Sequence, residues 1–108
     1  MNYQQGRTLQ EAVTTAEPGE VIEAAKEFFG RRSGIYAAFL EKEGPGYATF
    51  RGQGGEEIAI GTARAEGGTR VTGSTYLFDQ QVARFLALLP AAASIVGAGE
   101  EPVAGAAT

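Results

Sequence analysis

The clearest periodicity in the chain predicts an amphipathic helix over residues 18–30. Its apolar positions follow the i, i+4, i+7, i+8 spacing that places side chains on one helix face: Val21, Ala25, Phe28 and Phe29. Pro18 suits the first helical position, and Glu20 stands three residues after a possible cap at Glu17. Gly30 suits the C-terminal cap. We therefore predict a surface helix that buries one face.

A second helical stripe lies near the C-terminus, over residues 79–89. Its apolar side chains again recur at helical spacing: Val82, Phe85, Leu86 and Leu89. Asp79 is placed to cap this helix, and Pro90 is placed to end it. Residues 91–108 are mostly alanine and glycine and carry no core-forming pattern. They predict a flexible tail after a single domain at 1–90.

Between the two helices the period changes to two, which is typical of β-strands. Four stretches there are rich in β-branched and aromatic side chains: 35–41, 47–51, 56–65 and 70–77. A weaker alternation at 8–14 predicts one strand ahead of the first helix. The glycine-rich connections between the later strands are so short that only antiparallel hairpins fit. The predicted fold class is therefore α+β, in the order β-α-β-β-β-β-α, with an antiparallel meander packed against an N-terminal and a C-terminal helix.

Loop lengths set the strand register, because a slip of one residue sends every side chain to the opposite face. A two-residue loop at Gly67-Gly68 suits the last hairpin, since both central positions of such a turn favour positive φ. Within 52–55, a three-residue loop with a glycine bulge separates polar from apolar side chains better than a four-residue loop does. The predicted pairs are Ile60–Thr75, Arg64–Val71, Phe50–Ile58 and Ala48–Ile60.

This register divides the sheet into an apolar face beneath the helices and an outer face. The apolar face is predicted to hold Ile35, Phe39, Phe50, Ile58, Ile60, Val71 and Leu77. The outer face is predicted to hold Tyr36, Leu40, Tyr47, Arg51, Glu57, Ala59, Gly61, Ala63, Arg70, Thr72 and Tyr76. The glycines at the loops are then explained by turn geometry and not by phosphate binding, because no helix follows them.

Composition narrows the chemistry that is available. The 108 residues include no Cys and no His, which excludes thiolate nucleophiles, imidazole bases and Cys/His metal sites. We therefore expect neither an enzyme nor a bound cofactor. Thirteen acidic residues against nine basic ones give a net charge of −4, which argues against nucleic acid as a partner.

Two adjacent carboxylates, Glu56 and Glu57, invite an acid/base interpretation. Neighbours on a strand point to opposite faces, so these side chains cannot act as a pair. One of them is expected to form an ion pair with Arg51 across the hairpin.

The hydropathy pattern predicts no membrane span and no secretory signal. The one long uncharged run, 85–99, contains Pro90 and is shorter than the roughly 20 apolar residues that cross a bilayer. Residues 1–10 are polar and lack an apolar signal core. A chain free of cysteine is compatible with the cytoplasm, where we expect the protein.

The order of elements is itself informative. A strand, a helix beginning EPGEV, an antiparallel meander, a last strand GGTRVTGS and a closing helix DQQVARFLALL follow one another over roughly residues 8–89. Together they resemble a shortened helix-grip domain of the START-like, polyketide cyclase/dehydrase (SRPBCC) superfamily. In that superfamily a curved sheet wraps a C-terminal helix and encloses a pocket for hydrophobic ligands. The resemblance implies the strand order 1-5-4-3-2, although a second short helix and further strands of the superfamily are missing here.

Two hypotheses about function follow. The first is a non-catalytic interaction domain that forms a homodimer through the outer sheet face, where tyrosines surround small residues. The predicted interface is Tyr36, Tyr47, Ala59, Gly61, Ala63 and Tyr76. The alternative, implied by the resemblance, is a module that binds a small hydrophobic ligand between the sheet and the C-terminal helix. Its predicted pocket is Phe39, Phe50, Ile60, Phe85 and Leu89.

Overall fold

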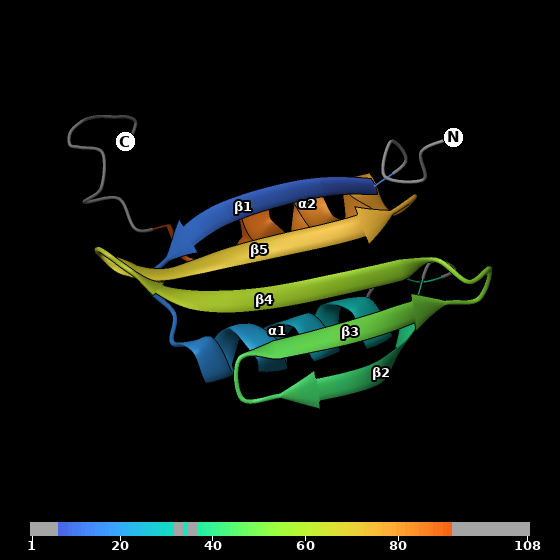
Figure 1. Cartoon of the computed structure of the whole chain (residues 1–108), viewed down its shortest axis with the longest axis horizontal. Coiled ribbons are helices and arrows are strands. Elements are labelled where there is room, and N and C mark those ends of the chain that lie inside the picture. The colour runs from blue at the N-terminus through green and yellow to red at the C-terminus, as the bar shows by residue number, and fades with distance from the viewer. Residues whose placement is uncertain (1–6, 32–33, 35–36, 92–108) are drawn as a thin grey trace.

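The computed structural model describes residues 7–31, 34 and 37–91, which form a five-stranded antiparallel sheet with both helices behind it (Figure 1). The elements are β1 (Arg7–Thr14), α1 (Pro18–Arg31), β2 (Ala38–Gly44), β3 (Tyr47–Gly52), β4 (Glu57–Ala65), β5 (Gly68–Tyr76) and α2 (Asp79–Leu88). Across the sheet the strands lie in the expected order β1-β5-β4-β3-β2. The predicted α+β class is confirmed. Residues 92–108 of the predicted tail lie outside the described residues.

The helix α1 begins as the sequence predicts and ends one residue later. Pro18 is its first residue, and the Glu20 carboxylate accepts the backbone N–H of Glu17 at 2.8 Å. This contact is the return half of a capping box, and it satisfies a backbone donor ahead of the helix. Gly30 is a helical residue and not the cap that was expected, because α1 continues to Arg31. A cation in the last turn complements the helix dipole.

The helix α2 is anchored by Asp79, although not through the predicted cap. Phe78 occupies the N-cap position without a side-chain cap hydrogen bond, and Asp79 is already helical. The Asp79 carboxylate instead accepts a hydrogen bond from the Thr8 hydroxyl at 3.0 Å. The backbone carbonyl of Asp79 accepts a hydrogen bond from Nε2 of Gln10, also at 3.0 Å. Asp79 therefore ties the start of α2 to β1, and its charge still favours the helix N-terminus.

The hairpin between β3 and β4 has the predicted register. Phe50 lies opposite Ile58, and Ala48 lies opposite Ile60. The N–H of Gly52 donates to the carbonyl of residue 56 at 2.8 Å, which leaves three residues in the loop. Gly55 has a φ of +92°, the left-handed conformation that a three-residue hairpin loop requires at this point. The choice of a glycine-bulge loop is confirmed.

The hairpin between β4 and β5 turns one residue earlier than predicted. Ala65 pairs with Gly68, so the two-residue loop is 66–67 and the observed partner of Ile60 is Gly73. The predicted pairs Ile60–Thr75 and Arg64–Val71 are wrong by two positions, which leaves every side chain on its predicted face. Gly68 has a different role: a Cβ there would collide with the backbone carbonyl of Thr14.

The edge strand β2 departs most from the prediction. It begins at Ala38, and its pairing with β3 shifts at a bulge between Leu40 and Lys42. Phe39 lies opposite Arg51 on the outer face, and Leu40 lies opposite Phe50 on the helix side, so the faces predicted for Phe39 and Leu40 are exchanged. A bulge adds an unpaired residue and alters the alternation that a sequence pattern assumes. Ile35 and Tyr36 lie outside the described residues.

The chain reverses between β5 and α2 at Leu77, which the sequence assigns to the apolar face. Leu77 has a φ of +84°, and its side chain is exposed. Phe78 is buried in its place, and the N–H of Phe78 donates to Oγ1 of Thr75 at 3.3 Å. The left-handed conformation at Leu77 thus places the ring of Phe78 in the core and leaves the smaller Leu77 side chain in solvent.

A cluster of phenylalanine rings fills the space between the sheet and the helices. The ring centroid of Phe29 in α1 lies 5.3 Å from that of Phe50 in β3 and 5.3 Å from that of Phe85 in α2. Phe28 lies 5.1 Å from Phe29 and 5.8 Å from Phe85. Aliphatic side chains complete the core: Val21, Ile22, Ile58, Ile60, Val71, Val82 and Leu86. The rings therefore join α1, α2 and the sheet into one core.

Candidate functional site: the outer sheet face

Figure 1 views the sheet from the side opposite the two helices, and we call this surface the outer sheet face. Strand register aligns its side chains in rows that cross the sheet. One row is Glu11, Thr72, Gly61 and Tyr47, and the next is Leu9, Ser74, Ala59 and Thr49. Small residues therefore occupy the central strand β4, with larger side chains on the strands around it.

The structure brings most of the predicted interface together on the outer sheet face. Strand alternation and register place Tyr47, Ala59, Gly61, Ala63 and Tyr76 there. Tyr47 and Tyr76 are each 42% exposed, Ala63 is exposed, and Ala59 and Gly61 are half-buried. The sixth residue, Tyr36, lies outside the described residues.

Two exposed apolar side chains extend the outer sheet face beyond the predicted set. Leu9 of β1 lies opposite Ser74 and is 68% exposed. Phe39 of β2 lies opposite Arg51 and is 60% exposed. The weak alternation of 8–14 assigns no face to Leu9, and the β2 bulge reverses the face of Phe39. Both edge strands therefore contribute apolar surface that sequence reasoning missed.

Three arginines on the outer sheet face are paired with carboxylates of the same chain, whereas the exposed Lys42, opposite Thr49 on the edge strand β2, has no ion pair among the described residues. The ion pairs are Arg7–Glu57 at 3.1 Å, Arg51–Glu41 at 3.0 Å and Arg70–Glu11 at 3.3 Å, each between a nitrogen and an oxygen. All of these side chains are partly exposed, so solvent screens each pair and its contribution to stability is small. Each pair joins one cation to one anion, so these six side chains together add no net charge to the outer sheet face.

Arg51 pairs with Glu41, and not with either of the two predicted partners. Glu57 is its neighbour in the register, but the Glu57 carboxylate is bound by Arg7. Glu56 turns back onto its own loop, where its carboxylate accepts a backbone N–H at 3.0 Å. Glu41 is the unpaired residue at the β2 bulge, and its hydrogen bonds and charge raise the pKa of Arg51. The bulge thus supplied a partner that strand spacing alone did not indicate.

The predicted ligand-pocket residues do not line one cavity in the part of the chain that the structure describes. Phe50, Ile60 and Phe85 are each 1% exposed and belong to the packed core. Phe39 lies opposite Arg51 in the register and, with Phe50, lines a hollow between α1 and β2, whereas Phe85 and Leu89 line a different hollow between α1 and α2. The five side chains are therefore divided between the core and two separate hollows.

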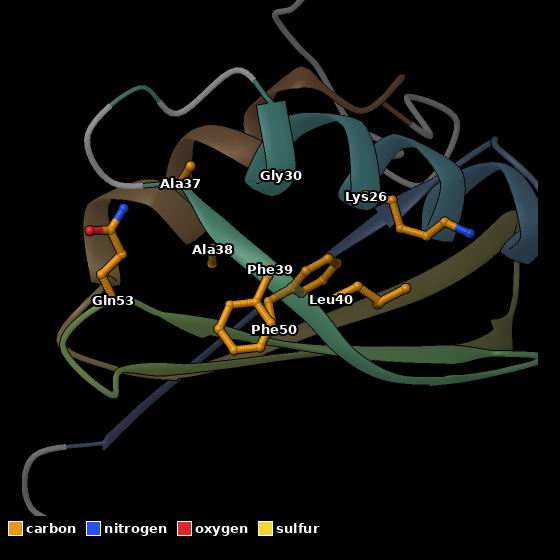
Figure 2. Close-up of a pocket in the computed structure, with 8 residues that line it drawn as sticks. All are labelled: Lys26, Gly30, Ala37, Ala38, Phe39, Leu40, Phe50 and Gln53. Atoms are coloured by element: carbon orange, nitrogen blue, oxygen red, sulfur yellow. The ribbon is translucent and has the colours of Figure 1, made fainter.

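A shallow hollow of about 330 Å³ lies between the C-terminal half of α1 and β2, with Phe39 and Phe50 in its lining (Figure 2). Lys26 stands at one end of this hollow and Gln53 at the other. Hydrogen bonds from the Lys26 ammonium to the carboxylates of Glu23 and Glu43 raise its pKa. A raised pKa keeps the amine protonated, so Lys26 links α1 to β2 and is poorly suited to nucleophilic chemistry.

Comparison with protein-family models, curated proteins and solved structures finds no match to this chain. Over the ranges 7–31, 34 and 37–91, no helix is long and apolar enough to cross a membrane. Over the same ranges, no group of three or more Asp or Glu side chains is arranged to hold a metal ion. The fold and the outer sheet face are therefore the observations on which a functional proposal rests.

Proposed function

We propose that this chain is a small non-catalytic interaction domain that forms a homodimer through its outer sheet face. One observation carries the proposal: Tyr47 on β3 and Tyr76 on β5 flank the small residues Ala59 and Gly61 on β4. Tyrosine combines a large apolar ring with a polar tip and is enriched at protein interfaces.

The small residues support close approach of a second sheet. Two sheets that pack face to face lie about 10 Å apart with their side chains interdigitated, so small residues on β4 leave room for the larger side chains of a second copy. In a two-fold dimer the same patch faces itself, so one self-complementary surface is sufficient. Ala59 and Gly61 would then lie near the symmetry axis, with the tyrosines around them.

The edges of the outer sheet face support the same proposal. Leu9 and Phe39, on the two edge strands, add apolar area around the centre. The arginines on this face have carboxylate partners within their own chain, and Lys42 lies on the edge strand β2, where it can remain in solvent when a second copy docks. Burying a charge without a partner is what most opposes association.

The packing of the core favours this function over the binding of an apolar ligand. A ligand between the sheet and α2 would have to displace the ring of Phe29, whose centroid lies 5.3 Å from that of Phe50 and 5.3 Å from that of Phe85. The strand order supports our further proposal that the chain is a shortened helix-grip domain. The proposed dimer does not depend on that relationship.

Sedimentation velocity at micromolar concentration tests the dimer directly. We expect the unmodified protein to sediment as a dimer and the Ala59→Glu variant to sediment as a folded monomer, because two unpaired carboxylates would meet across the axis. Gly61→Lys should act in the same direction. The matched control is Ala87→Glu, which adds the same side chain at an exposed position of α2. Circular dichroism checks that each variant is folded.

Two results would overturn the proposal. One is an unmodified protein that sediments as a strict monomer. The other is a dimer that persists in folded Ala59→Glu protein, which would place the contact on another surface.

A further inference from the structure

An apolar groove lies between α1 and α2, on the side of the molecule opposite the outer sheet face. Its volume is about 570 Å³. Phe85 forms a buried floor, Phe28 is half-buried beside it, and Leu88 at its edge is 59% exposed. Leu88 follows the last buried positions of α2 and points away from the core stripe. A large exposed aliphatic side chain beside an apolar hollow is typical of a docking surface.

The charged side chains that line this groove are acidic. Glu20 and Glu27 of α1 line one wall, and both are exposed. The Glu20 carboxylate also caps its helix, and Glu27 makes a long, exposed ion pair with Arg31 at 3.8 Å, so both side chains reach solvent beside the groove. The last turn of α2 contains no basic residue, and the nearest cation of this helix is the exposed Arg84, one turn before Leu88.

We propose that this groove binds an amphipathic helix of a partner protein, with leucine-like side chains on one face and lysine or arginine beside them. The apolar face would lie over Phe28, Phe85 and Leu88, and the cations would lie near Glu20 and Glu27. The ten residues of α2 extend about 15 Å, which matches a partner helix of roughly three turns. Helix-in-groove recognition reads such a ligand by its i, i+3, i+4 and i+7 side chains.

The charge pattern selects this occupant over a second copy of the chain. Docking two copies groove to groove would bring the same acidic walls, with Glu20 and Glu27, close together in an apolar interface. Like charges in such a position oppose association, whereas a cationic helix neutralises them. This inference does not rest on the proposed dimer, which uses the opposite face of the molecule.

Fluorescence anisotropy with two designed helical peptides tests the proposal. Each peptide has about 14 residues, with leucines at helical spacing and either lysine or glutamate at the flanking positions. We expect the lysine peptide to bind at least about tenfold more tightly than the glutamate peptide at low salt. Added salt should reduce this difference. Equal binding of both peptides, or no binding of either, would overturn the proposal.

Variants locate the binding surface. Leu88→Lys removes the exposed aliphatic contact and adds a repelling cation, and it should weaken binding of the lysine peptide by at least about tenfold. Leu77→Lys is the matched control, because Leu77 is similarly exposed but lies before the other end of α2. The double variant Glu20→Gln, Glu27→Gln should remove the preference for lysine, while Gln at 20 retains a capping acceptor.

The two proposals fail in distinguishable ways. Leu88→Lys should leave sedimentation unchanged, and Ala59→Glu should leave peptide affinity unchanged. Peptide affinity that is insensitive to Leu88→Lys would overturn the groove proposal alone. Conversion to monomer by Leu88→Lys, with Ala59→Glu still dimeric, would make the groove a self-association surface and overturn both.

Discussion

Arg7 and Glu57 belong to strands that are not neighbours, yet their side chains meet at 3.1 Å across β5. The Nε–H of Arg7 also donates to Oγ of Ser74 on the intervening strand, at 2.7 Å. Arg7 lies opposite Tyr76 in the register, so the ion pair crosses the outer sheet face beside one of its tyrosines. One side chain thus connects three strands at the edge of the proposed interface.

This contact should be modest in energy and sensitive to salt. Both side chains are about one-third exposed, and exposed ion pairs contribute about 0.2–1 kcal/mol to the free energy of unfolding. We expect a double-mutant cycle of Arg7→Ala and Glu57→Ala, followed by urea unfolding, to give a coupling in that range. The coupling should fall as salt is added. A coupling that does not respond to salt would contradict this account of the pair.

Truncation of Phe85 and of Phe28 to alanine should show that a fully buried ring contributes more to stability than a half-buried one. Phe85→Ala should lower the free energy of unfolding by about 3–5 kcal/mol, because the ring is 1% exposed and contacts Phe28 and Phe29. Phe28→Ala should cost less, because Phe28 is already partly in contact with solvent at the groove. Urea denaturation of both variants measures the difference. Equal losses would mean that the helices cover Phe28 more fully than this packing indicates.

Gly68 should be among the least replaceable residues of the sheet. Its φ is +155°, and a Cβ added there would collide with the backbone carbonyl of Thr14, which cannot move away as a flexible side chain does. We expect Gly68→Ala to lower the free energy of unfolding by about 2–4 kcal/mol. The control Gly19→Ala places its methyl in open space within the first turn of α1, and it should raise stability by up to about 1 kcal/mol. Thermal denaturation compares the two, and a neutral Gly68→Ala would contradict the close approach.

The pH dependence of stability should reveal the link between α1 and β2 through Lys26. Hydrogen bonds to Glu23 and Glu43 raise its pKa above the ordinary value of 10.5. The folded state therefore holds this proton more tightly than the unfolded state does, and the stabilisation is complete below pH 10.5. It is lost as pH rises through the raised pKa.

Thermal melting from about pH 9 to about pH 12 tests this expectation against the Lys26→Met variant. Tyrosines also titrate in this range. The melting temperature of the unmodified protein should therefore fall more steeply than that of Lys26→Met. Parallel curves would show that Lys26 contributes nothing to the difference.

Local spacing was sufficient for the elements whose determinants lie close together in the chain. The stripe from Val21 to Phe29 predicts α1, because residues three and four apart lie on one side of a helix whatever surrounds it. The pairing of Phe50 with Ile58 follows from loop length and the glycine at position 55, both within a few residues. The tyrosine-bearing face followed in turn, because side chains alternate strictly along unbroken strands.

Contacts between segments that are distant in the sequence decided the features that local spacing did not predict. Gly68 is required by Thr14 of a strand far away in the sequence, so it resembles a turn glycine until the sheet is assembled. The β2 bulge exchanges the faces of Phe39 and Leu40. Both residues are hydrophobic, so the sequence pattern does not indicate this exchange. The groove beside Leu88 exists because two helices from opposite ends of the domain lie against one sheet. Sequence alone thus determined the periodic elements and the unbroken faces, because periodicity is a local property of the backbone. Tertiary structure decided the close approaches and surface hollows, because these depend on which segments meet.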